Sequence, residues 1–304
     1  MTETQTPPPQ ADPPTGRVQV RADLPPGARL EITIEAEGAP PQTHILHNRR
    51  ATPRRLRRTF AWRAGYLVPW AALLALSLYL VTRLVALDRF PIFFFTDEAI
   101  QTMHAADLLH NQLRVEKEYL PTYFVNGDQY NLSVSVYAQV LPALLGPRSI
   151  WVTRGVSVLI GTLAALAVGL TLKDVFRAQQ PWLATLLLAL TPAWFLHSRT
   201  AFETVLAVAF YAMFLYAYLR YRCGAVRFLY LAILCAALSF YSYSPAQLGV
   251  GLTAALLFVS DWRYHWQQRA VLLRGLGLVL LLALPYLRHQ LMHPGETARH
   301  LEIL

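Results

Sequence analysis

Long apolar runs separated by short polar segments dominate the chain between residues 66 and 287. Several of these runs approach the roughly 20 residues that a helix needs to cross a bilayer. The pattern therefore predicts an all-α fold, a polytopic membrane helix bundle with about seven spans. The predicted spans cover residues 66–87, 150–172, 181–196, 203–219, 228–240, 246–259 and 270–287.

One further apolar run, residues 132–146, is short for a span and is interrupted by Pro142. We expect it to form an interfacial or re-entrant helix on the outer side of the membrane. The alternative, in which this run crosses the membrane, reverses the orientation of every later segment. Residues 197–203 would then face the cytoplasm, opposite the acidic loop that precedes the run.

Composition and charge fit a membrane protein of defined orientation. Hydrophobic residues make up 55% of the chain, charged residues 15%, and the mean hydropathy is +0.32. The net charge is +9, but arginines gather before the first span, as in a cytoplasmic flank. We therefore expect a multi-pass protein of the cell membrane with a cytoplasmic N-terminus and no nucleic-acid partner. The flank contains Arg49, Arg50, Arg54, Arg55, Arg57, Arg58 and Arg63.

The composition divides the chain into two parts. Residues 1–60 form a Pro-rich, basic tail that we expect to be cytoplasmic and largely disordered. Within the tail, alternation over residues 17–34 around Pro25-Pro26-Gly27 suggests a small hairpin. Residues 61–304 form the transmembrane domain, whose outer loop, residues 88–150, carries seven acidic and four basic side chains. The first span begins too late in the chain for a cleaved signal peptide.

Two adjacent carboxylates, Asp97 and Glu98, follow Thr96 directly after the apolar segment 90–95. Apolar residues then recur at helical spacing, so Asp97 falls at or near the N-terminus of a helix that lies along the membrane. The helix dipole can hold a carboxylate ionised there, ready to accept a proton or bind a metal. The alternative is that Thr96 or Asp97 only caps the helix.

A third carboxylate, Glu203, is the one acid at an outer membrane end between residues 65 and 290 outside the large loop. The other two acids of that region, Asp174 and Asp261, accompany basic cytoplasmic turns. An ionisable residue at a membrane boundary is costly and therefore a functional candidate. Alternatively, Glu203 forms an ion pair with Arg199, four residues earlier.

Cationic and imidazole side chains lie at the same outer ends. Arg154 and Arg199 could bind the phosphate of a membrane-anchored sugar donor, because a guanidinium matches phosphate oxygens. They could equally be interfacial anchors. A divalent cation stays open as a cofactor, with Glu203 and His197 as its candidate ligands, although the histidines have no spacing that marks a metal site. The other two candidate histidines are His104 and His110.

The order of these features resembles a known family. A basic tail, one span and an outer loop that opens with an aromatic run and Thr96-Asp97-Glu98 are followed by four short motifs. In this order they resemble the GT-C glycosyltransferases, and within them the protein O-mannosyltransferase and aminoarabinose-transferase-like branch, over residues 66–290. The four motifs are Arg154-Gly155-Val156-Ser157, Leu190-Thr191-Pro192, the turn from His197 to Glu203, and Tyr241-Ser242-Tyr243-Ser244-Pro245.

The resemblance implies an inverting transferase that moves a sugar from a polyprenyl-phosphate donor in the membrane lipid to a protein or lipid acceptor at the outer face. Asp97 matches the family's general base and Glu98 its frequent acidic neighbour. Arg154 matches the arginine that contacts the lipid phosphate, while Arg199 and Glu203 match a polar turn after the third span.

The resemblance also indicates which part of a family member this sequence corresponds to. Family members usually continue through further spans, so this chain corresponds to their N-terminal part, and whether it is active alone stays open. The competing class is a non-catalytic multi-pass protein, such as a transporter subunit or an assembly scaffold. Charges inside the spans that line a path, or internal repeats, would favour that class, and the sequence shows neither clearly.

Overall fold

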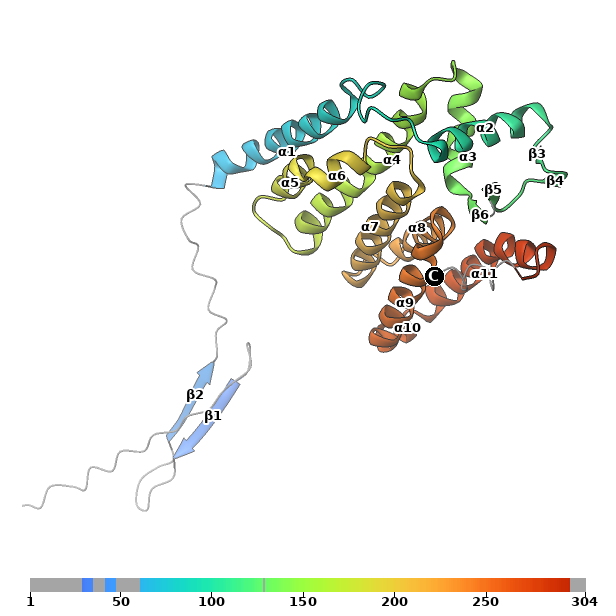
Figure 1. The fold of residues 1–304 in the computed structure, drawn as a ribbon. Coiled ribbons are helices and arrows are strands. Elements are labelled where there is room, and N and C mark those ends of the chain that lie inside the picture. Colours follow the sequence, from blue (N-terminus) through green and yellow to red (C-terminus); the bar gives the residue numbers. More distant parts are fainter. Residues whose placement is uncertain (1–28, 35–41, 48–60, 128, 296–304) are drawn as a thin grey trace, which may run out of the picture. The chain divides into compact units, whose positions relative to one another are not determined.

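The computed structural model describes residues 29–34, 42–47, 61–127 and 129–295 (Figure 1). Contacts divide the chain into two compact units, Met1–Arg63 and Ala64–Leu304. We describe each unit by itself.

The described part of the first unit is a two-stranded antiparallel hairpin. Strand β1 (Arg29–Ile34) pairs with β2 (Gln42–His47), and Leu30 lies opposite Leu46. β1 falls within the predicted hairpin over residues 17–34, and its partner among the described residues, β2, comes later in the chain. The sequence of β2 includes Thr43 and Ile45, and β-branched residues favour strands. Residues 17–28, and the predicted disorder of most of the tail, lie outside the described residues.

The second unit is built from helices that follow the apolar runs. Six of the seven predicted spans coincide with one helix each, and α4 continues into a π-helical turn, η1 (Thr171–Val175). Three helical segments in the described part of the chain are long and apolar enough to cross a membrane: Ile150–Val175, Glu203–Arg222 and Arg269–Met292. The protein is thus a helical membrane protein, while the count of seven spans stays a prediction. The six helices are α1 (Ala61–Leu84), α4 (Ile150–Leu170), α7 (Glu203–Arg222), α8 (Phe228–Ser242), α9 (Ser244–Ser260) and α11 (Arg269–Met292).

The third predicted span, residues 181–196, is two helices instead of one. Helix α5 (Trp182–Leu190) ends before Thr191, whose ψ of 114° is extended, and α6 (Pro192–His197) starts at Pro192. Proline has no backbone N–H and suits the first turn of a helix, so it breaks the run at this point. A last short helix, α10 (Trp262–Gln267), joins α9 to α11.

The segment between α1 and α4 folds into a small unit of its own. Helices α2 (Thr96–His110) and α3 (Val134–Leu145) pack together with two short hairpins. At 1.5 Å per residue, the 12 residues of α3 extend only about 18 Å, short of a bilayer core. The short helix agrees with the predicted non-crossing segment, whose depth in the membrane stays a prediction. The hairpins are β3 (Arg114–Val115) with β4 (Glu118–Tyr119), and β5 (Phe124–Asn126) with β6 (Gln129–Leu132).

Close packing of α4 against α7 fixes the positions of the side chains discussed below. A Cβ atom added to Gly161 on α4 would lie 3.2 Å from Cγ1 of Val205 on α7. Small residues let membrane helices approach in this way. Because Val205 lies in the first turn of α7 and Arg154 is two turns before Gly161, the contact holds the starts of both helices together.

Candidate active site

Asp97 and Glu98 both lie in the first turn of α2, as the sequence predicts. The N-cap residue is Phe95, so the alternative in which Thr96 or Asp97 caps the helix is wrong. The Phe95 backbone N–H donates to Oε1 of Glu98 at 3.2 Å. Glu98 therefore satisfies one of the backbone donors at the start of the helix, and Asp97 does not have that task.

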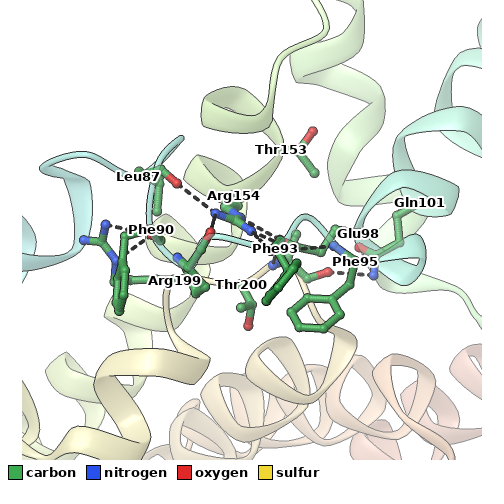
Figure 2. A network of polar contacts seen from close by, with 12 residues as sticks. Leu87, Phe90, Phe93, Phe95, Glu98, Gln101, Thr153, Arg154, Arg199 and Thr200 are labelled. Atoms are coloured by element: carbon green, nitrogen blue, oxygen red, sulfur yellow. Dashed lines mark hydrogen bonds and ion pairs between the residues drawn. The ribbon is translucent and has the colours of Figure 1, made fainter.

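Glu98 is completely buried, and four hydrogen bonds fix its carboxylate (Figure 2). Arg154 donates from Nε to Oε2 and from Nη2 to Oε1, both at 2.9 Å. The backbone N–H of Ala201 donates to Oε2 at 2.9 Å, in addition to the bond from Phe95. A buried carboxylate that already accepts four hydrogen bonds has little capacity left for substrate, so the contacts favour a structural role for Glu98.

Arg154 has all five of its N–H donors engaged, and its side chain is completely buried. Besides the two bonds to Glu98, Nη1 donates to the carbonyl oxygens of Leu87 and Pro91, and Nη2 donates to that of Phe93. A guanidinium carries five N–H groups. Binding of a donor phosphate by Arg154 would therefore require it to exchange partners.

Arg199 is likewise occupied, by the chain at the end of α1. It donates to five backbone carbonyl oxygens at distances of 2.6–3.1 Å and so caps the C-terminus of that helix. The predicted alternative of an Arg199–Glu203 helical pair is not seen among the described residues, since α7 begins only at Glu203. The acceptors belong to Thr82, Arg83, Val85, Ala86 and Phe90.

A third buried arginine, Arg83, was not among the predicted site residues. It donates to Oγ of Ser198 at 3.1 Å and to the carbonyl oxygens of Leu188 and Ala189 at the end of α5. Its guanidinium also stacks on the ring of Tyr79, with its carbon 4.2 Å from the centroid. An arginine inside the apolar run 66–87 is the signal that could have identified it, because a charge within a span is costly.

Asp97 lies outside this saturated network and is partly exposed. Asn126, at the end of β5, donates from Nδ2 to Oδ1 of Asp97 at 3.1 Å. His104 on α2 donates from Nε2 to the Val125 carbonyl oxygen at 2.8 Å, which ties the same strand to α2. Asn126 was not predicted; the following Gly127, with a φ of +64°, marks the tight turn that places it here.

Glu203, the first residue of α7, is close enough to Asp97 for the two negative charges to act on each other. Its Oε2 atom is buried and has no hydrogen-bond partner among the described residues. A buried carboxylate oxygen without a partner is costly, which makes Glu203 a candidate for binding a hydrogen-bond donor. The structure thus places Asp97 and Glu203 within electrostatic range of each other, while their approach to within a single contact shell stays a prediction.

The candidate metal ligands are not brought together in the described part of the chain. His197 is exposed at the end of α6, and His110 lies beside Arg148 instead of a carboxylate. No group of three or more His, Cys, Asp or Glu side chains that could hold a metal occurs among the described residues. We therefore assign no step to a metal.

Two cavities lie elsewhere in the second unit. The larger, of about 480 Å³, is lined mainly by apolar side chains of α8, α9 and α11. The smaller, of about 220 Å³, lies between the hairpins of the first loop and the end of α11, near Met292. Asp97 and Glu203 line neither cavity, so the candidate site rests on its side chains and not on a closed pocket.

Comparison with known proteins now identifies the class. Residues 134–289, just over half of the chain, match the model of the dolichyl-phosphate-mannose-protein mannosyltransferase family. The chain therefore belongs to this family of the GT-C superfamily, which confirms the resemblance seen in the sequence. Family membership implies a mannosyltransferase-like membrane glycosyltransferase. No curated protein and no solved structure matches the chain. The matched region includes Arg154, Arg199 and Glu203 and begins after Asp97.

Proposed function

We propose that the protein transfers a mannose-like sugar from a polyprenyl-phosphate donor to a hydroxyl group of a protein acceptor, with Asp97 as the general base. The observation that carries this assignment is the contrast between two adjacent carboxylates. Glu98 has four hydrogen-bond donors, whereas Asp97 is partly exposed and has one side-chain donor among the described residues, Asn126. A general base needs a free oxygen within reach of the proton it accepts.

The proposed reaction is a single displacement. Asp97 removes the proton of the acceptor hydroxyl, and the oxygen attacks the anomeric carbon of the sugar. The bond from that carbon to the phosphate oxygen breaks, polyprenyl phosphate leaves from the opposite face, and the configuration inverts. Phosphate is a good leaving group, so one base can suffice if the reactants are well oriented.

Glu203 supplies the second contact of the proposed site. Its unpartnered Oε2 can accept a hydrogen bond from a hydroxyl of the sugar or of the acceptor. That bond would satisfy the buried oxygen only when substrate is bound. The negative charge of the neighbouring Asp97 makes such a neutral donor, or a cation, favourable at this position.

The three arginines have a positioning role in this proposal. Arg154 holds Glu98, and Glu98 accepts the Ala201 N–H just before α7, so the starts of α2 and α7 are tied together. Gln101 adds a bond from Nε2 to the Ala201 carbonyl oxygen at 2.7 Å. The network thereby sets the distance between Asp97 and Glu203. Direct phosphate binding by Arg154 or Arg199 stays a prediction that needs a rearrangement of their present bonds.

Orientation completes the proposal. Basic residues favour the cytoplasmic side of the membrane. We therefore propose that the cytoplasmic segments are residues 1–60 and the loops near 173–180, 220–227 and 261–269, and that the acidic segment 88–150 lies on the outer side. Single cysteines at positions 117 and 222, in a chain without its native cysteines, can be labelled from outside. Labelling at 117 alone is expected; labelling at 222 alone would reverse the orientation.

The function is tested with the full chain reconstituted in lipid vesicles. Radiolabelled polyprenyl-phosphate mannose and a Ser/Thr-containing peptide are supplied, and a nucleotide-linked mannose serves as the alternative donor. We expect label to pass to the peptide from the lipid donor and not from the nucleotide. Asp97→Asn is the matched inactive control. A protein that is folded and binds the lipid donor but transfers to no acceptor would instead support the non-catalytic class.

A further inference from the structure

The segment between α1 and α2 turns apolar side chains outward. Ile92 is 79% exposed and Phe93 is 73% exposed, and the neighbouring Phe90, Phe94 and Phe95 are also exposed to lesser degrees. Five large apolar side chains in six residues form a continuous exposed patch, which we name the 90–95 loop. An exposed apolar patch of this kind marks an interaction site.

The backbone of the same segment is satisfied from inside the protein. Arg154 and Arg199 together donate to six carbonyl oxygens between residues 85 and 93. Figure 2 shows three of the acceptor residues, Leu87, Phe90 and Phe93, beside the two arginines. If the loop lay in water, water molecules would donate hydrogen bonds to these carbonyl oxygens, and donors from the protein would not be needed. In hydrocarbon an unpaired carbonyl is costly, and irregular chain is tolerated there only when its polar groups are satisfied by the protein. The acceptors belong to Val85, Ala86, Leu87, Phe90, Pro91 and Phe93.

The apolar surface of the loop continues a surface that faces lipid. On α1, exposed side chains of Leu74, Leu78, Val81 and Val85 lead along the helix to the loop. Between helix and loop, Asp88 and Arg89 are exposed, as expected for charged groups at the level of the lipid headgroups. The patch is therefore contiguous with the membrane-facing side of α1.

We infer that the 90–95 loop inserts into the leaflet at the Leu84 end of α1, with Ile92 and Phe93 among the acyl chains. The occupant of the patch is thus membrane lipid. The insertion is shallow, about 5–10 Å, as for interfacial segments. Arg154 and Arg199 make the insertion feasible because they replace the water that the loop backbone would lose. The inference does not depend on the proposed reaction.

Site-directed spin labelling in vesicles of phosphatidylcholine and phosphatidylglycerol tests this placement. Single cysteines replace Ile92 and, independently, Phe93 in the full chain, after Cys223 and Cys235 are changed to alanine. Leu74→Cys on α1 provides the hydrocarbon control, and Arg114→Cys, at an exposed position in β3, provides the control outside the 90–95 loop. Collision rates with oxygen, which concentrates in hydrocarbon, and with a water-soluble nickel chelate are measured for each label.

At positions 92 and 93 we expect the ratio of oxygen to nickel collisions to be several-fold above that at 114 and below that at position 74, because the insertion is shallow and Leu74 lies about 15 Å farther along α1. A ratio like that at 114 would overturn the inference, because the loop would then lie in water. Labels shielded from both reagents would also overturn it, since protein would then cover the patch. Protection from nickel that requires added polyprenyl phosphate would assign the patch to the donor instead of the bulk lipid. The two positions are tested separately so that one misfolded variant does not decide the outcome.

Discussion

Helix α7 begins at Glu203 and ends at Arg222, and polar groups gather at both of its ends in different ways. At the Arg222 end, Asp261 accepts from Nε of Arg222 at 2.8 Å and from the hydroxyl of Tyr218 at 2.6 Å. Both ring nitrogens of His265 lie within hydrogen-bond distance of tyrosine hydroxyls, those of Tyr218 and Tyr221. The carboxylate and the imidazole at this end are thus partnered within the protein, whereas Nε of Arg220 is buried without a hydrogen-bond partner.

At the Glu203 end the polar groups divide into two sets. Arg154, Arg199 and Glu98 are saturated with hydrogen bonds. Glu203 instead keeps a buried oxygen without a partner, within electrostatic range of the partly exposed Asp97. The comparison teaches that burial and charge alone do not mark a candidate site, because a fully bonded side chain has no capacity left for substrate. What distinguishes the Glu203 end is an unsatisfied carboxylate oxygen with a second, partly exposed carboxylate nearby, whereas the carboxylate at the Arg222 end is fully paired.

The largest expected effect is on stability, from Glu98→Ala. Removing one partner of a buried ion pair leaves an uncompensated charge on Arg154, so the free energy of unfolding should fall by about 3–5 kcal/mol. Chemical denaturation in detergent measures the change.

A double variant, Glu98→Leu with Arg154→Met, is the matched control and should recover part of that loss, because no unpaired charge remains while the carbonyl oxygens of Leu87, Pro91 and Phe93 lose their donor. Equal losses in the single and the double variant would contradict the structural role of the pair. The double variant also sharpens the comparison with the sequence-based prediction. If it folds but no longer binds the lipid donor, Arg154 contacts the phosphate after all.

The next effect is on transfer, from Glu203→Gln. If Oε2 accepts a hydrogen bond from bound substrate, losing the charged acceptor should slow transfer by about 10- to 100-fold, in line with the 1.5–3 kcal/mol of such a bond. Stability should be unchanged or slightly higher, since a buried charge is removed. Transfer assays and thermal melting in detergent give the two values.

Asp261→Asn is the control at the opposite end of α7. It should leave the rate of transfer unchanged and reduce stability by no more than about 1 kcal/mol, because the Arg222–Asp261 pair is partly exposed. If Glu203→Gln behaved like Asp261→Asn in both assays, the two ends of the helix would be equivalent and the contrast would be lost.

A smaller effect is expected from Asn126→Ala, which removes the donor to Oδ1 of Asp97. Transfer should fall about tenfold, the equivalent of one hydrogen bond. Gln129→Ala, in the partner strand of the same hairpin, is the control, and it should leave the rate of transfer in place. An equal loss of rate in the two variants would mean that Asn126 only stabilises the hairpin.

The smallest effect concerns pH and the Arg222 end. Burial lowers the pKa of His265 below its ordinary value of 6.5; the Asp261 charge opposes this shift and the Arg222 charge adds to it. The unfolded chain then binds the proton of His265 more readily than the folded chain does. The contribution of this group to the free energy of unfolding is therefore fully present above pH 6.5 and falls as the pH decreases below that value. For one proton, the free energy of unfolding can change by no more than about 1.4 kcal/mol per pH unit. Melting between pH 7.5 and 5.5 measures it, and His265→Gln should flatten the dependence. An equal pH dependence in that variant would remove His265 as its source.

The helices could be predicted from the sequence because a span needs a long apolar run, and six of the seven runs are single helices. The start of α2 before Asp97 could also be predicted, since apolar spacing begins there. The break at Thr191 shows what hydropathy alone misses. Residues 181–196 form one mostly apolar run, and only Pro192 signals that a helix ends before it. Likewise, the alternation of apolar and polar residues indicates a strand near β1 but does not specify which segment pairs with it.

The candidate site was harder to predict than the helices. The sequence indicates that Arg154 and Arg199 are unusual, but their acceptors are backbone carbonyls of an irregular loop, which no residue pattern encodes. Asn126 reaches Asp97 from a hairpin 29 residues away along the chain. The sequence therefore selected Asp97, Glu98, Arg154, Arg199 and Glu203 as candidates, whose roles stay a prediction, and it missed Arg83. The division into saturated and available groups emerged only from the fold.

The central claim is that adjacent carboxylates have separate tasks, Asp97 in catalysis and Glu98 in structure. It is tested most directly by the single-turnover transfer rate of Asp97→Asn at saturating lipid donor, with Glu98→Gln measured beside it. Asparagine keeps the size of the side chain but cannot accept the proton, so we expect a fall of about 10²–10⁴-fold with unchanged melting and donor binding. Glu98→Gln should lower the melting temperature instead. Full transfer by a folded Asp97→Asn protein would contradict the account.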